Sequence, residues 1–252
     1  MAARLGKGID AIGTHANLSG VNRFPTTRRS AVAALGAVGS QERERAWTVL
    51  VAAYYPPARA YVSRRWNADP DEAEDLVQGF FASAYEHGFI ARFDHRKARF
   101  RTWLRVGLDG WVANARRSTA RLKRGGGAVH VPLDGDLAEV LPAALEDPDA
   151  WFEREWARTL FALAVDALRE RYAARHGLRL RLFERHDLVE DEAPSYRTLA
   201  EAEGIAVTDV TNHLAAARRD LRALVLERLR ALTVDDEEFR AEARRLLGAD
   251  PA

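Results

Sequence analysis

Two segments of opposite charge follow one another directly in this chain, and the first contains Asp71-Glu72-Ala73-Glu74-Asp75-Leu76-Val77-Gln78-Gly79-Phe80-Phe81. Residues 66–91 hold six acidic residues and no Lys or Arg, whereas residues 92–124 hold eleven basic residues against two acidic ones. Aromatic residues are interleaved among the basic ones at Phe93, Phe100, Trp103 and Trp111. A charge step of this size indicates two neighbouring surfaces that have different partners.

The acidic segment has the pattern of an amphipathic helix whose first residue is Pro70. Helical spacing places an apolar stripe on one side, formed by Val77, Phe80, Phe81 and Ala84. A row on another side, at i, i+3, i+4 and i+7, is formed by Asp71, Glu74, Asp75 and Gln78. Pro suits the first helical position, and early acids suit the positive end of the helix dipole. The row is either a solvated face or a docking surface, and Gln78 and the adjoining basic segment favour docking.

The basic segment predicts a second helix from about residue 99 to residue 121. Its apolar residues recur near helical spacing, so most of its aromatic side chains are expected in a core. The arginines remain to face outward. An aromatic seam bordered by arginines suits single-stranded or opened nucleic acid, through stacking and phosphate neutralisation. An Arg-rich face that serves solubility alone is the alternative.

These segments resemble conserved region two of bacterial RNA polymerase sigma factors of the sigma-70 superfamily, and within it the short extracytoplasmic-function (ECF) group. The resemblance rests on Glu72-Ala73-Glu74-Asp75-Leu76-Val77-Gln78-x-x-Phe81, on Phe100-Arg101-Thr102-Trp103-Leu104 and on Asn114-Ala115-Arg116-Arg117. It implies that the acidic helix docks on the clamp helices of the largest polymerase subunit, through Asp71, Glu72, Glu74, Asp75, Gln78 and Phe81. It also implies that the basic helix melts and reads the minus-ten element, through Phe100, Arg101, Trp103, Trp111, Asn114, Arg116, Arg117 and Arg121. For Phe100 and Trp103 a structural role is the alternative.

Composition limits the classes of protein that the chain can represent. With 252 residues, of which 47% are apolar, it is long enough for one large or two small domains. It has no cysteine, which excludes disulfides and Cys-based zinc sites and suits a reducing cytoplasm. Its apolar runs are far shorter than the ~20 residues of a membrane span, so we expect a cytoplasmic protein without membrane insertion. The net charge is only +1, so any nucleic-acid footprint must be local.

The remainder of the first half predicts one helical domain between flexible segments. We expect a flexible extension over residues 1–39, although Phe24-Pro25-Thr26-Thr27-Arg28 is similar to the beginning of some ECF-like sigma factors. The region-two-like domain is expected over residues 40–124, with two helices or one bent helix around Pro56-Pro57. Residues 125–150, with six acids and no Lys or Arg, are the predicted linker. The resemblance implies that this linker lies in the RNA exit path of polymerase; a solubilising linker is the alternative.

A helix-turn-helix is predicted within residues 151–232. Ser195 can cap a short helix, a turn follows from Gly204, and Thr208 can cap a longer helix to about Leu229. The second helix of such a motif enters the major groove, where Asn212 and His213 would meet base edges. The residues expected to contact DNA are Thr211, Asn212, His213, Arg218 and Arg219. The segment resembles region four, which reads the minus-thirty-five element and contacts the polymerase flap; an ordinary helical bundle is the alternative.

The expected fold is therefore all-α, with two small helical domains and an acidic C-terminal tail over residues 233–252 that is either solvated or an extra helix. We predict no catalytic residue, metal site or cofactor, because there is no Glu-x-x-His pair, Walker loop or His pair at i, i+4. A stand-alone helix-turn-helix regulator with a helical sensor domain is the main alternative, and a nucleic-acid adaptor that uses residues 92–124 is a third. Dependence on core polymerase separates these classes. An anti-sigma factor or other regulator is a further partner class.

Overall fold

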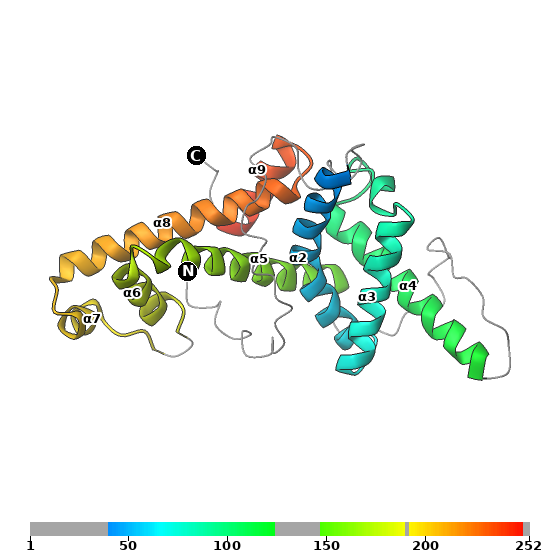
Figure 1. The fold of residues 1–252 in the computed structure, drawn as a ribbon, viewed down its shortest axis with the longest axis horizontal. Helices are drawn as coiled ribbons and strands as arrows, with labels where there is room; N and C mark the ends of the chain where they lie inside the picture. The colour runs from blue at the N-terminus through cyan, green and yellow to red at the C-terminus, as the bar shows by residue number, and fades with distance from the viewer. Residues whose placement is uncertain (1–39, 124–146, 190–191, 249–252) are drawn as a thin grey trace. The chain divides into compact units, whose positions relative to one another are not determined.

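The computed structural model describes residues 40–123, 147–189 and 192–248, which are helical and contain no β-strand (Figure 1). The all-α prediction is confirmed for these residues. The predicted N-terminal extension, with Phe24-Pro25-Thr26-Thr27-Arg28, and most of the predicted linker lie outside them. In chain order the elements are α2 (Ser40–Arg65), α3 (Pro70–Glu86), the 3-10 helix η1 (Ile90–Arg92), α4 (Phe100–Lys123), α5 (Pro148–Ala173), α6 (Gly177–Asp187), α7 (Tyr196–Glu203), α8 (Val207–Leu232) and α9 (Asp236–Leu247).

The described residues divide into two compact units. The N-terminal unit contains residues 40–123, 147–159 and 231–239, and the C-terminal unit contains residues 160–189, 192–230 and 240–248. The N-terminal unit therefore includes the first turns of α5, which follow the predicted linker. None of the described helices is both long enough and apolar enough to span a membrane.

Helix α2 continues through Pro56 and Pro57 as a single helix, so of the two predicted arrangements the chain adopts one helix. Each interior proline removes a backbone hydrogen bond. The helix persists because its inner face is fully buried on both sides of the prolines, at Leu50 and Tyr54 before them and at Val62 after them.

Helix α3 begins as the sequence predicts, with Pro70 at its first position. The side chain of Asp69 caps it, because its carboxylate accepts hydrogen bonds from the backbone N–H groups of Asp71, at 3.1 Å, and Glu72, at 2.8 Å. The predicted apolar stripe is buried at Val77, Phe80, Phe81 and Ala84. Helix α3 thus packs through that stripe and leaves its acidic row outward.

Close packing of α3 on α4 depends on a glycine. A Cβ at Gly79 would lie 3.1 Å from Cζ2 of Trp111, and the indole N–H of Trp111 donates to the backbone oxygen of Leu76 at 2.9 Å. The indole therefore lies against the α3 backbone, a position that a larger residue at 79 would crowd. Trp111 is half-buried there.

The segment predicted as a helix-turn-helix lies in the C-terminal unit and forms the helices α7 and α8. Ser195 caps α7 as predicted, since its hydroxyl accepts from the Thr198 N–H at 3.1 Å. Gly204 ends α7 with φ 66°, a left-handed conformation that favours glycine. Helix α8 begins at Val207, so the predicted cap at Thr208 is wrong, because that residue already lies inside the first turn.

The segment expected as an acidic tail forms helix α9 over Asp236–Leu247, so the extra-helix alternative describes it. Phe239 and Ala243, one helical turn apart, are both buried. Because these two apolar side chains face inward, residues 236–247 are not a solvated terminus.

Candidate functional site

The exposed face of α3 carries an acidic row. Asp71, Glu74, Asp75 and Gln78 are all exposed. Glu74 accepts a hydrogen bond from the Tyr55 hydroxyl at 2.7 Å, and burial together with this carboxylate raises the pKa of Tyr55. The row therefore presents three carboxylates and one amide on the exposed side of α3.

Phe81, which the resemblance assigned to polymerase docking, belongs to the core instead of this row. It is only 4% exposed, and its ring packs on Trp47, Tyr55 and Phe80. Phe81 belongs to the buried apolar stripe through which α3 packs, so it fixes the orientation of α3 from its inner side.

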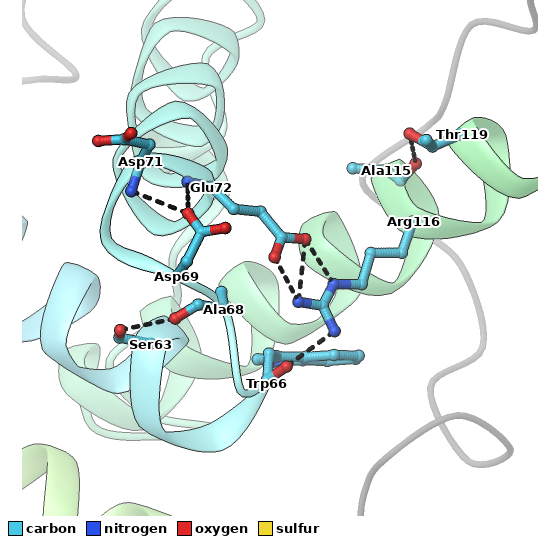
Figure 2. A network of polar contacts seen from close by, with 9 residues as sticks. All are labelled: Ser63, Trp66, Ala68, Asp69, Asp71, Glu72, Ala115, Arg116 and Thr119. Atoms are coloured by element: carbon cyan, nitrogen blue, oxygen red, sulfur yellow. Dashed lines mark hydrogen bonds and ion pairs between the residues drawn. The ribbon is translucent and has the colours of Figure 1, made fainter.

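Glu72 and Arg116 join the two segments that the sequence analysis kept apart (Figure 2). The Arg116 guanidinium donates Nε and Nη2 to the two Glu72 oxygens at 3.0 Å each, and Nη1 to the backbone oxygen of Trp66 at 2.8 Å. The pair borders a groove of about 920 Å³ between the start of α3 and the last turns of α4, which Asp69, Asp71, Asp75 and Thr119 also line. A residue predicted for polymerase docking is thus paired with one predicted for DNA.

Several residues of α4 that were predicted to contact DNA have structural surroundings. Phe100 is 2% exposed and packs on Tyr54 and Phe93, and Asn114 is 9% exposed. Trp103 is half-buried and stacks on Phe89, with 4.0 Å between ring centroids. For Phe100 burial therefore favours the structural alternative named above.

Arg101 and Arg105 face the beginning of α5. The Arg101 Nη2 donates to Glu153 at 3.0 Å, and its guanidinium lies 4.0 Å from the centroid of the Trp156 ring. Arg105 donates Nε to Asp149 at 2.6 Å and Nη1 to Asp109 at 2.8 Å. Sequence reasoning missed these contacts, because Asp149 lay in the predicted linker and Glu153 in the predicted second domain.

The exposed cations near α4 lie at its two ends. Arg117 is exposed and its guanidinium contacts the side-chain oxygen of Asn114, while the side chain of Arg121 lies outside the described part of α4. Before α4, exposed cations occur at Arg92, Arg96, Lys97 and Arg99. Arg96 hydrogen-bonds Asp94 and thereby lowers the pKa of that carboxyl to about 2. These four residues belong to the basic segment 92–124, but the sequence analysis assigned DNA contacts only to residues of the predicted helix and so did not include them.

The first half of α8 carries the residues predicted to contact DNA. Thr211, Asn212 and Arg219 are exposed, and His213 is half-buried. Arg218 is exposed but held, because it donates Nε and Nη2 to Asp187 at 2.9 and 2.7 Å and Nη1 to the Tyr196 hydroxyl at 3.2 Å. The Arg218 contacts tie α8 to the end of α6 and the start of α7.

The comparisons with known proteins concern the N-terminal unit. Residues 50–122 match the family model of sigma-70 region 2, and this range covers most of α2 and α4 and the whole of α3. No curated protein and no solved structure matches the chain. Among the described residues no cluster of His, Cys, Asp or Glu is placed to hold a metal ion. The helices that carry the acidic row and the Arg-rich face are thus those that match sigma-70 region 2.

Proposed function

We propose that this protein is a sigma factor of the ECF type, which binds core RNA polymerase and directs promoter recognition and melting. The match of residues 50–122 to sigma-70 region 2 is the observation that carries the proposal. The charge distribution supports it, since exposed carboxylates line α3 and exposed arginines and a lysine flank α4. Such a factor acts where polymerase acts, in the cytoplasm.

The docking surface in this proposal is the exposed row of Asp71, Glu74, Asp75 and Gln78. Oppositely charged surfaces steer association and fix the orientation of two partners. A row on one helix face can engage the clamp helices of the largest subunit side by side, and the buried Phe81 holds that face in place.

Promoter contacts in this proposal divide between the two units. Arg117 and the exposed cations before α4 would neutralise phosphates of the minus-ten region, while the half-buried Trp103 and Trp111 border the strand path. In the C-terminal unit the exposed Thr211 and Asn212, with His213, would read base edges of the minus-thirty-five element. The same unit would contact the polymerase flap.

Capture of core polymerase by the purified full chain tests the proposal. The variant carries Asp75→Arg with Gln78→Ala, and the control carries Glu42→Arg, an exposed charge reversal in the first turn of α2. Wild type and control should capture core enzyme and the double variant should not. Capture by all three proteins would refute the docking face. If the folded wild type captures no core enzyme but protects an operator from cleavage by itself, the protein is a stand-alone regulator.

A further inference from the structure

A cavity of about 430 Å³ lies between residues 97–102, which lead into the first turn of α4, and the start of α5, inside the N-terminal unit. Cations and carboxylates border it together. One side is formed by Lys97, Ala98, Arg99, Arg101 and Thr102, and the other by Asp149, Phe152 and Glu153.

Glu153 is the carboxylate that engages the cations of this cavity. Its Oε1 lies 3.0 Å from Nη2 of Arg101 and 3.8 Å from Nη1 of Arg99. Asp149 is committed elsewhere, because it binds Arg105 at 2.6 Å. The Glu153 side chain is 30% exposed and that of Arg99 is 63% exposed, so both reach solvent.

The helix that carries Glu153 is held independently of this ion pair. Phe152 and Trp156 are 1% and 0% exposed, and their rings pack on Tyr61 and Tyr54. Burial of two large aromatic side chains stabilises far more than a partly exposed ion pair does. The beginning of α5 can therefore stay in place while the Glu153 carboxylate rotates outward.

We propose that this cavity is a phosphate subsite for single-stranded promoter DNA, in which the Glu153 carboxylate stands in for a DNA phosphate until the strand displaces it. Carboxylate and phosphate oxygens accept from the same guanidinium donors. The lysine and Thr102 that line the cavity add donors suited to phosphate. The inference rests on the proposed function. It assigns a part in strand binding to α5, which lies outside the matched residues 50–122.

The expected effect follows from charge. Glu153→Gln removes one negative charge beside the subsite and keeps an oxygen that can accept from Arg101. A unit charge within about 5 Å of a phosphate at a partly solvated surface changes affinity by roughly three- to tenfold. Binding should therefore tighten by that factor in Glu153→Gln and weaken by about threefold in Arg99→Gln, which removes a cation of the same subsite.

The test titrates a fluorescently labelled, thymidine-rich single-stranded oligodeoxynucleotide with the full chain and follows anisotropy at several salt concentrations. The matched control is Glu155→Gln, the same change two residues along α5, where the side chain pairs with Arg158 and does not line the cavity. Tighter binding by Glu153→Gln than by Glu155→Gln supports the subsite. Equal affinities, weaker binding by Glu153→Gln, or no binding by either protein would overturn it.

Capture of core polymerase by the same variants separates this inference from the proposed function. The variants should capture core enzyme as wild type does, since the acidic row of α3 is unchanged. Retained capture with unaltered DNA affinity would defeat the phosphate subsite alone. Failure of the wild type itself to capture core enzyme would defeat the sigma-factor role.

Discussion

Asp109 is a buried carboxylate on which the N-terminal unit depends, and Asp109→Ala should destabilise that unit strongly. Asp109 is 1% exposed. It accepts hydrogen bonds from the Tyr61 hydroxyl at 3.0 Å, the Trp66 indole N–H at 2.9 Å and Nη1 of Arg105 at 2.8 Å. Burial raises its pKa, while the donors from Trp66 and Tyr61 act in the opposite direction.

The magnitude follows from the donors left behind. Arg105 keeps Asp149 as a partner, but the Tyr61 hydroxyl and the Trp66 indole lose the acceptor that this carboxylate supplies. A buried donor without an acceptor costs about 1–3 kcal/mol, so two cost about 2–6 kcal/mol. Removing the carboxylate also removes its own desolvation cost, which is visible in the raised pKa of Asp109. We therefore expect a loss in the lower part of that range, about 2–4 kcal/mol.

Tryptophan fluorescence isolates the unit concerned. All six tryptophans lie in the N-terminal unit, at Trp47, Trp66, Trp103, Trp111, Trp151 and Trp156. Urea unfolding of the full chain, followed by this fluorescence, should show the loss for Asp109→Ala and almost none for the exposed Asp75→Ala. A decrease in the free energy of unfolding below about 1 kcal/mol for Asp109→Ala would refute a stabilising role of the hydrogen bonds to Asp109.

Two further substitutions test packing in one unit and an ion pair in the other. Gly107→Ala should destabilise the N-terminal unit by about 1–3 kcal/mol in the same urea assay, because the new Cβ would lie 2.3 Å from Cζ of the buried Phe89; unchanged stability would contradict this. Arg218→Ala should accelerate amide hydrogen exchange at the end of α6 and the start of α7, because it removes the hydrogen bonds to Asp187 and to the Tyr196 hydroxyl. Arg219→Ala, at the exposed neighbouring position, is the control. Equal exchange in both variants would contradict a stabilising role of the Arg218 contacts.

Local rules predicted the helices that carry the candidate site. The apolar stripe of α3 follows the helical period, and Pro70 and Ser195 mark helix starts because capping and proline geometry involve only neighbouring residues. Local rules failed at Thr208, because a residue type that can cap a helix can also lie inside its first turn. They left two alternatives for α9, an extra helix or a solvated terminus, because its short apolar pattern competed with its acidic composition.

Tertiary packing decided which charged residues face a partner. The sequence by itself determined that a carboxylate-rich helix precedes an arginine-rich one, and that a capped short helix, a glycine turn and a longer helix follow. It did not determine that Arg116 pairs with Glu72, that Arg101 pairs with Glu153, or that Arg218 is tied to Asp187, pairs separated by 44, 52 and 31 positions. A helical period shows which side of its own helix a residue occupies. Which element packs on that side, and therefore whether an arginine meets a carboxylate or solvent, depends on contacts that only the folded chain brings together.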